Sequence, residues 1–299
     1  MKWLMTGASG FVGQALERAL QARGDAVWRL VRRTPQTDVE IEWDPARGRL
    51  EPEDLARIAP DLVVNLAGRS IVGRLSRRAK DEILQSRVAA TRTLVDGLAA
   101  AGLTSTRLLS ASAIGIYGSR SEPVDEAATP GEGFLADVCR QWEAEALRAA
   151  KTGTAVTLLR FGIILDPSGG MLARLLPVFR CGLGGRLGDG RQWMSWISLH
   201  DTVSAILFLA NAGVDGPVNV VAPQPVTNQM FTEALADVLG RPAFLPVPRA
   251  AIALAFGGDA RDVFFQDCAV MPGRLREAGF AWRDPELGPF LASALGGTA

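Results

Sequence analysis

The sequence is poor in the side chains that bind metals and form disulfides. Among 299 residues there is one histidine, His200, and there are three widely spaced cysteines, Cys139, Cys181 and Cys268. With one histidine a histidine-based metal site is excluded. Without any Cys-x-x-Cys pair or Cys/His cluster, neither a disulfide framework nor a zinc site is supported. The cysteine usage therefore predicts a protein of a reducing compartment that holds no metal ion.

Long apolar runs and an excess of charge of one sign are absent as well. No apolar segment approaches the roughly 20 residues that cross a bilayer, and the N-terminus lacks the basic region and apolar segment of a signal peptide. Acidic and basic residues balance at 32 each, so the chain has no general attraction to nucleic acid or to an anionic membrane. These absences predict a cytoplasmic protein without a nucleic-acid or membrane partner, and they leave a homodimer open.

The sequence does contain a large apolar fraction, arranged in an alternating pattern. Hydrophobic residues make up 48% of the chain, which is enough for a sizeable core. Over the first 160 residues short apolar strands alternate with amphipathic helices. This alternation predicts an α/β fold with a parallel, doubly wound sheet of the Rossmann type. The predicted strands are 2–6, 26–31, 40–43, 61–67, 107–113 and 155–160, and the predicted helices are 11–22, 76–101 and 132–150.

The second half of the chain is richer in glycine loops and less regular. We expect a dinucleotide-binding domain over residues 1–165, to which a segment at about 193–222 returns. A smaller α/β lobe over 166–299, with a C-terminal segment from about 240, is expected to fold over the carboxyl edge of the sheet. Asp201 is interpreted as the N-cap of a helix to about residue 212, and Thr227 as the N-cap of another.

The stretch TGASGFVG at 6–13 places three glycines between the first strand and the first helix. Gly7 permits the tight turn, Gly10 lets the backbone approach a pyrophosphate, and Gly13 lets helix and strand pack closely. The helix N-terminus offers free N–H groups and the positive end of a dipole. This setting favours a dinucleotide site over a turn without a ligand. The predicted contacts are Gly7, Ser9, Gly10, Phe11, Val12 and Gly13.

The end of the second predicted strand discriminates between the two nicotinamide dinucleotides. Val31 stands where an NAD site usually has an acid for the ribose hydroxyls, and Arg32 and Arg33 follow it. A carboxylate would repel a 2′-phosphate, whereas arginine attracts one. The sequence therefore predicts NADP, with NAD less favoured. The alternative is that both arginines only solvate the end of a strand.

Several motifs together resemble the extended short-chain dehydrogenase/reductase superfamily over nearly the whole chain. They are TGxxGxxG at 6–13, VVNLAG at 63–68, SASAIGIYG at 110–118 and GDGRQWMSWISLHD at 188–201. A narrower resemblance points to an atypical group of NAD(P)-dependent, nucleotide-sugar-epimerase-like proteins with a small extra C-terminal domain. It lies in EWDP at 42–45, SRV at 86–88, GLGGRLGDGRQWMSWI at 182–197, VAPQPVTNQMF at 221–231 and RLREAGF at 274–280.

The resemblance extends the predicted cofactor site to later strands and to the helix over 76–101. Asp44 would lie near the adenine edge, although capping a turn is an equal alternative. Arg160 ends the strand whose backbone meets the nicotinamide, and a core ion pair is the alternative for its side chain. The further cofactor contacts that the resemblance implies are Leu66, Ala67, Gly68, Ser86 and Ser110.

The proton-transfer pair of the superfamily is missing from this chain. That pair is a Tyr with a Lys four residues later, and the Lys helps to lower the pKa of the phenol. The single tyrosine, Tyr117, is followed by GSRS, so no such pair exists. If Glu143 is matched to the glutamate that the superfamily has later in the same helix, Leu135 stands at the Tyr position and Cys139 at the Lys position. Standard epimerase or alcohol-dehydrogenase chemistry is therefore not predicted.

Two other hydroxyl groups are the remaining catalytic candidates. Ser112 ends a strand at the cleft edge, where the superfamily has its catalytic hydroxyl, although a serine there also satisfies local backbone. Tyr117 is a candidate stand-in acid, and simple packing of its ring is the favoured alternative.

The substrate side of the chain also departs from the sugar-nucleotide enzymes. Met194 stands at the position of their diphosphate-binding arginine, so a UDP- or dTDP-sugar is unsupported. Arg191 and Trp193 are the predicted substrate contacts, with core packing as the alternative for the tryptophan.

Two functions remain after these steps. The first is an NADP(H)-binding epimerase or oxidoreductase that acts on an unidentified small molecule, which the retained glycine-rich loops favour. The second is a non-catalytic NADP(H)-sensing regulatory protein that acts through a protein partner, which the missing Tyr and Lys favour.

Overall fold

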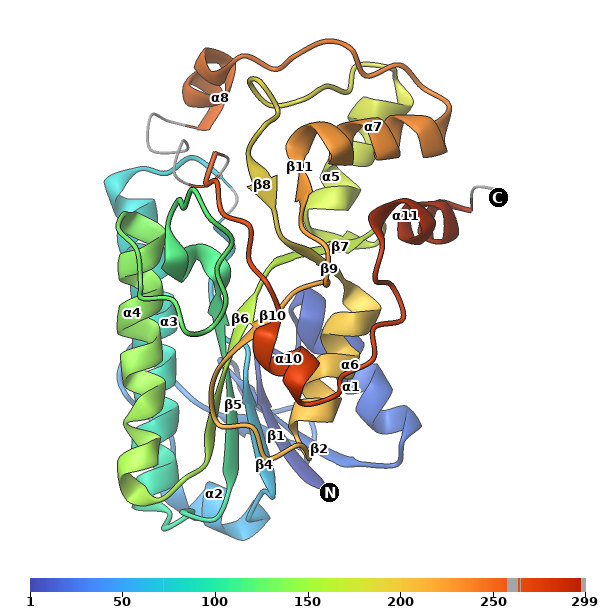
Figure 1. Ribbon diagram of the computed structural model, residues 1–299. Helices are drawn as coiled ribbons and strands as arrows, with labels where there is room; N and C mark the ends of the chain where they lie inside the picture. The colour runs from blue at the N-terminus through green and yellow to red at the C-terminus, as the bar shows by residue number, and fades with distance from the viewer. Residues whose placement is uncertain (72, 257–262, 264, 297–299) are drawn as a thin grey trace.

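A seven-stranded parallel sheet forms the centre of the molecule (Figure 1). The computed structural model describes residues 1–71, 73–256, 263 and 265–296. In the sheet the strands lie in the order β10-β6-β5-β4-β1-β2-β3, and neighbouring strands are parallel. This order confirms the predicted doubly wound α/β fold. The strands are β1 (Lys2–Thr6), β2 (Ala26–Val31), β3 (Glu40–Glu42), β4 (Leu62–Asn65), β5 (Arg107–Ala113), β6 (Val156–Phe161) and β10 (Gly216–Val220).

The two faces of the sheet are covered by different helices, because successive side chains of a strand point to opposite sides. In β1, Trp3 and Met5 join one core with the helices α1 (Phe11–Ala22) and α6 (Leu199–Leu209). Leu4 joins the opposite core with the helices α2 (Pro52–Ile58) and α3 (Arg77–Ala100). The helix α4 (Phe134–Leu147) packs beside α3 on that second face. The continuous apolar strands of the sequence are those of a sheet buried on both sides.

The second half of the chain builds a lobe beyond the carboxyl ends of the strands (Figure 1). Its core contains Leu172, Phe179, Phe231 and Phe290. The other elements of this half of the chain are β7 (Ile163–Asp166), α5 (Gly170–Arg180), β8 (Trp193–Met194), β9 (Trp196–Ser198), β11 (Val226–Thr227), α7 (Asn228–Leu239), α8 (Arg249–Phe256), α10 (Gly273–Glu277) and α11 (Leu287–Leu295).

Two segments of the second half return to the sheet domain. β10 pairs with β6, and α6 packs on α1; both elements lie within residues 193–222. A second return falls within 240–299, all of which was assigned to the lobe from sequence: α10 packs on β10, and Leu275 and Phe280 join the core of the first face. The C-terminal segment thus spans both parts of the molecule.

Of the two predicted N-caps, Thr227 is confirmed and Asp201 is wrong. Thr227 caps α7, because its hydroxyl accepts a hydrogen bond from the amide of Met230 at 3.2 Å. Asp201 does not cap α6: Ser198 is the N-cap and accepts from the amide of Asp201 at 3.0 Å. The buried carboxylate of Asp201 instead accepts from the amides of Arg283 and Asp284 at 3.0 and 2.9 Å, and so ties α6 to the C-terminal segment.

Sequence reasoning also missed α2, a seven-residue helix with a polar first turn. Among the described residues, no helix has the length and hydropathy that crossing a bilayer requires.

Candidate functional site

The glycine turn is held tightly between β1, α1 and the end of β4. Gly7 has a φ of +68°, and a Cβ atom on it would lie 2.7 Å from the carbonyl oxygen of Leu66. A Cβ atom on Gly13 would collide with the backbone of Gly7 and Ala8. Neither position tolerates a side chain, as predicted for the first and third glycines.

Gly10 has a less crowded environment than Gly7 and Gly13. It is the N-cap of α1 with an extended φ of −78°, and no side chain caps the helix. A Cβ atom on Gly10 would meet a single neighbour within 4 Å, the carbonyl oxygen of Gly7 at 3.1 Å. The first turn of α1 carries no acidic residue. An uncapped helix N-terminus with an open approach and no acid fits a dinucleotide pyrophosphate.

A buried polar cluster fixes the chain beside this turn. The Thr6 hydroxyl donates to the side-chain oxygen of Asn65 at 2.7 Å and accepts from the amides of Leu66 and Ala67, both at 3.0 Å. The Asn65 amide in turn donates to the hydroxyl of Ser110 at 3.2 Å. Ser110 is completely buried. Through Asn65 and Thr6 its side chain helps to hold the backbone of Leu66 and Ala67, two of the predicted contacts.

The two arginines after β2 have different surroundings. The Arg33 guanidinium donates to both carboxylate oxygens of Glu40, at 2.9 and 2.7 Å, and these hydrogen bonds lower the pKa of Glu40. Arg32 is exposed, and among the described residues it has no hydrogen bond or ion pair. Only Arg32 therefore has its guanidinium unengaged at the carboxyl end of β2.

Two other predicted cofactor contacts, Asp44 and Ser86, have side chains that bond to backbone amides of the protein. The Asp44 carboxylate accepts from the amides of Ala46 and Arg47 at 3.1 and 3.3 Å, which is the turn-capping alternative. Ser86 accepts from the amide of Arg69 at 3.0 Å and thereby holds the loop next to Gly68. The sequence around Asp44 gave no means of choosing between cofactor binding and turn capping.

The first catalytic candidate, Ser112, lies in a buried ionic network. Its hydroxyl donates to Glu143 Oε1 at 2.6 Å. The Arg160 Nε and Nη2 atoms donate to the two oxygens of the same carboxylate, each at 2.8 Å. Arg160 is thus in the core ion pair that was the alternative for its side chain. Ser112 is 2% exposed, and its hydroxyl orientation is set by Glu143.

The second candidate, Tyr117, belongs to the same network. Its hydroxyl donates to the side-chain oxygen of Asn219 at 2.7 Å and accepts from Arg160 Nη1 at 2.8 Å. The ring is 0% exposed, and burial raises the pKa of the phenol. A neutral, enclosed phenol with both hydrogen bonds made corresponds to the packing alternative and does not support the stand-in acid.

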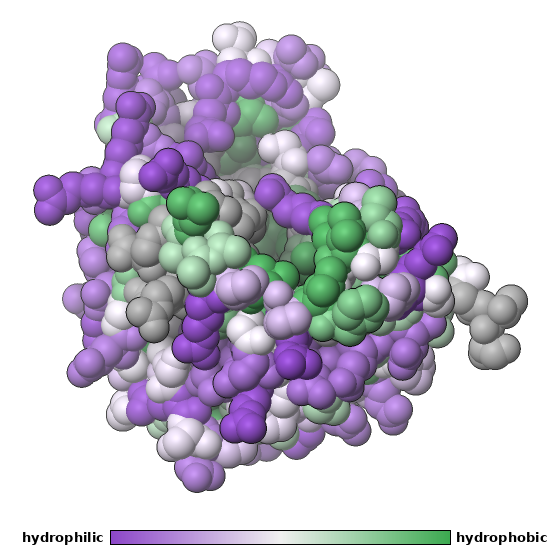
Figure 2. All heavy atoms as spheres, turned by 90° about the horizontal axis from the view of Figure 1, so that it is seen from above, coloured by the Kyte–Doolittle hydropathy of each residue, from purple (hydrophilic) through white to green (hydrophobic). Residues whose placement is uncertain are grey.

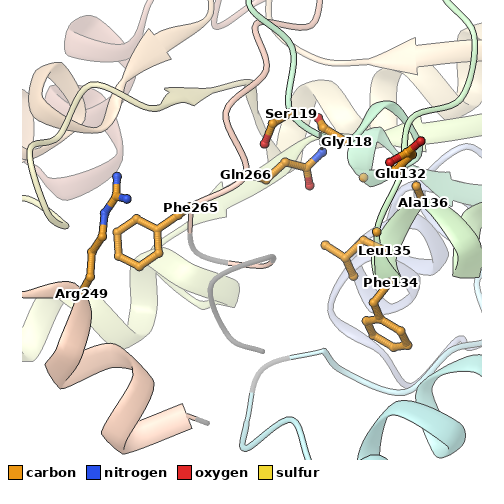
Figure 3. Close-up of a pocket in the computed structure, with 11 residues that line it drawn as sticks. Gly118, Ser119, Glu132, Phe134, Leu135, Ala136, Arg249, Phe265 and Gln266 are labelled. Carbon is orange, nitrogen blue, oxygen red and sulfur yellow. Dashed lines mark hydrogen bonds between the residues drawn. The ribbon is translucent and has the colours of Figure 1, made fainter. Parts of the chain in front are cut away.

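The residues at the missing pair carry no group that ionises near neutral pH. Leu135 lies in the first turn of α4 and borders a pocket (Figure 3). Cys139, one turn later, is 3% exposed, and burial raises the pKa of its thiol to about 11. The thiol therefore stays protonated at neutral pH.

This burial predicts how the three thiols react. Thiolates, not thiols, attack disulfide reagents. In a titration of the native protein at pH 7.5 with an aromatic disulfide, Cys181, the exposed cysteine, reacts at once, whereas Cys139 and Cys268 react only after unfolding. Cys181→Ser should remove the fast phase. Rapid reaction of that variant would contradict the enclosed position of Cys139.

The pocket beside Leu135 has a volume of about 300 Å³ and lies between the sheet domain and the C-terminal segment. Figure 2 shows the surface hollowed on the face that carries the lobe, with apolar side chains beside the hollow. One wall comes from Gly115, Gly118, Ser119 and residues 132–136, and the other from Arg249, Phe265 and Gln266. Sequence reasoning missed the second wall, because no local pattern brings these residues to α4.

The predicted substrate contacts lie elsewhere. Arg191 and Trp193 do not line this pocket, and Trp193 is 38% exposed, so its core-packing alternative is wrong. The neighbouring Trp196 is buried and stacks on Phe290 with ring centroids 5.4 Å apart. His200 is exposed beside Asp201, whose carboxylate is already engaged by backbone amides.

Comparisons with known proteins cover the whole described architecture. The chain matches the model of the NAD dependent epimerase/dehydratase family over residues 3–222 and that of a domain of unknown function (DUF1731) over residues 247–294. It is 41% identical over 293 residues to the epimerase family protein Mb2239 of Mycobacterium bovis, which covers 97% of this chain and 96% of that protein.

Two crystal structures extend the comparison to three dimensions. The human epimerase family protein SDR39U1 (isoform 2) with NADPH is similar at a TM-score of 0.88 and 30% identity, with 100% of both chains covered. The nucleoside-diphosphate sugar epimerase from Corynebacterium glutamicum is similar at a TM-score of 0.80 and 32% identity, with 99% of this chain and 58% of that chain covered. The resemblance inferred from the motifs is confirmed over nearly the whole chain.

Proposed function

The chain belongs to the NAD dependent epimerase/dehydratase family, and we propose that it binds NADP(H) and acts as an epimerase- or oxidoreductase-like enzyme on a small molecule. The observation that supports this most is the uncapped N-terminus of α1 at Gly10, together with an unengaged arginine at the carboxyl end of β2, the strand next to β1. The NADPH in the crystal structure of the human relative agrees with the proposed cofactor.

The preference for NADP(H) over NAD(H) is assigned to Arg32. Val31 precedes it, so no acid at the strand end opposes a 2′-phosphate. Arg33 is engaged by Glu40 and is less able to bind a second anion. A charge-assisted hydrogen bond contributes about 1.5–3 kcal/mol, so the preference should be at least about tenfold.

Arg32→Ala is expected to remove most of this preference. NADPH should bind about tenfold or more weakly to the variant, whereas NADH binding should change little. Calorimetric titration of both dinucleotides measures the difference, and Arg33→Ala is the matched neighbour with a smaller expected loss. Equal affinity of the wild type for NADPH and NADH, or a larger loss in Arg33→Ala, would contradict the assignment.

The chemistry that these residues allow is restricted. The bound cofactor would supply a hydride donor or acceptor. Leu135 exchanges no proton, and the protonated thiol of Cys139 is a poor partner for a developing charge. Ser112 is the remaining hydroxyl at this edge of the sheet, and Glu143 holds its proton. We infer slow hydride transfer with the proton supplied by solvent, because the Ser112 hydroxyl is buried and donates to Glu143.

The replacement of the Tyr and Lys by Leu135 and Cys139 also favours a second function, an NADP(H)-sensing regulatory protein without turnover. Oxidation of NADPH, followed at its absorbance with a panel of small aldehydes, ketones and keto acids, separates the two. Oxidation that depends on both the substrate and the protein supports the enzyme. NADPH binding without oxidation by any member of the panel favours the sensor.

A further inference from the structure

The pocket next to Leu135 is closed on one side by the C-terminal segment, and hydrogen bonds fix that wall. The Gln266 side chain donates to the carbonyl oxygen of Gly118 at 2.9 Å. The backbone of Asp267 contacts its neighbours twice: its amide donates to the Ser119 hydroxyl at 3.2 Å, and its carbonyl accepts from the Arg120 amide at 2.7 Å. These bonds fix residues 266 and 267, and Phe265 and Gln266 line the pocket.

Arg249 provides a positive charge on this wall. It is the first residue of α8, and its guanidinium stacks on the Phe265 ring, 4.9 Å from the centroid (Figure 3). A Cβ atom on Gly188 would lie 3.2 Å from Arg249 Nε and 3.4 Å from the Phe265 ring, so the backbone there packs closely against the pair. Among the described residues Arg249 has no ion pair and no hydrogen bond. A stacked guanidinium leaves its in-plane N–H groups free for a carboxylate or phosphate.

The opposite side of the pocket restricts what such an anion carries. Leu135 presents an apolar surface, and the exposed carboxylate of Glu132 lies at the end of the pocket away from Arg249 (Figure 3). A second anionic group near Glu132 would be repelled. The volume of about 300 Å³ lies at the lower end for ligand pockets. The fitting ligand is compact and has one anionic end.

From these observations we propose that Arg249 is an anion-binding residue and that the substrate is a compact organic carboxylate or phosphate ester. The region that matches a domain of unknown function would then form the anion-binding wall of the substrate pocket. The proposal rests on the proposed function only in taking this pocket as the substrate site. Binding of the anion itself needs no turnover.

The test is calorimetric titration of the full chain, with and without saturating NADP⁺, using benzoate, phenyl phosphate and the neutral isostere benzamide. The proposal predicts that at least one anion binds and that benzamide binds at least about tenfold more weakly, since a charge-assisted contact is lost. The better of the two anions identifies the carboxylate or the phosphate ester as the ligand class. Arg249→Gln should weaken the anion to the level of benzamide, and Arg249→Lys should retain part of the affinity.

Arg241→Gln is the control, because Arg241 is exposed in the same lobe and does not line the pocket. It should leave anion binding unchanged, and both Arg249 variants should leave NADPH binding unchanged. Absence of anion binding by the wild type, equal binding of benzoate and benzamide, or full binding by Arg249→Gln would each overturn the proposal. If the wild type does not bind NADPH, the proposed function is overturned instead.

Discussion

Gly10→Val is expected to abolish NADPH binding without unfolding the protein. The N-cap Gly10 has an extended backbone that valine adopts, and its open side is where a pyrophosphate would approach the first turn of α1. An isopropyl group there would block the approach. Loss of two or more charge-assisted hydrogen bonds corresponds to about a 100-fold weaker affinity or worse.

Calorimetry with NADPH measures this loss, and thermal unfolding of the same sample shows whether the fold survives. Gly288→Val is the control, because it makes the same exchange in α11, where a Cβ atom would meet nothing within 4 Å. Gly13→Ala should instead lower stability, since its Cβ atom meets the backbone of Gly7. NADPH binding by Gly10→Val at wild-type strength would rule out the glycine turn as the pyrophosphate site.

Arg160→Met is expected to destabilise the fold by about 3–5 kcal/mol, because it leaves the buried carboxylate of Glu143 without its cation. Arg160 and Glu143 are both buried, and their paired hydrogen bonds of 2.8 Å also position Ser112 and Tyr117. Urea unfolding of wild type and variant measures the difference in the free energy of unfolding.

The control is Arg107→Met on the neighbouring strand β5. Arg107 pairs with Asp215 at 2.7 Å, but the Asp215 side chain is 59% exposed, so its loss should cost at most about 1 kcal/mol. The double variant Arg160→Met/Glu143→Gln should be less destabilised than Arg160→Met alone, because no unpaired charge remains buried. Equal effects of Arg160→Met and Arg107→Met would show that the ion pair is not buried in solution.

The parts of the fold that depend on local pattern could be predicted from sequence. The apolar runs of β1, β5 and β6 require a sheet buried on both faces, and the glycines at 7 and 13 require a turn with close backbone contacts. Short elements with weak patterns could not: the polar first turn of α2 conceals a helix. Asp201 has the chemistry of an N-cap, but Ser198 stands three residues earlier and takes that role.

The site was less predictable, because its contacts join residues far apart in the chain. Whether Arg33 binds a phosphate depends on Glu40, and whether Arg160 faces a ligand depends on Glu143. Each partner is one acid among 32 in the sequence, so composition gives no means of choosing it. The Arg249 wall depends on a C-terminal segment that crosses to α4. The absence of the Tyr and Lys pair, by contrast, follows directly from the sequence.

The position of the lysines decides whether another residue replaces the missing one. Lys2 begins β1, at the end of the strand opposite the glycine turn, and Lys151 lies in the short 3-10 helix Ala149–Thr152 after α4. Lys80 lies in the first turn of α3, with Nζ 5.0 Å from the ring centroid of Phe134, the residue before Leu135. Lys80 is therefore the candidate among these three lysines to replace the missing one.

A crystal structure of the protein with NADP(H) bound tests the central claim most directly. The account predicts a pyrophosphate at the N-terminus of α1, Leu135 facing the nicotinamide, and no lysine within hydrogen-bonding distance of the nicotinamide ribose. A structure in which Lys80 binds that ribose, or in which Leu135 lies away from the nicotinamide, would contradict it.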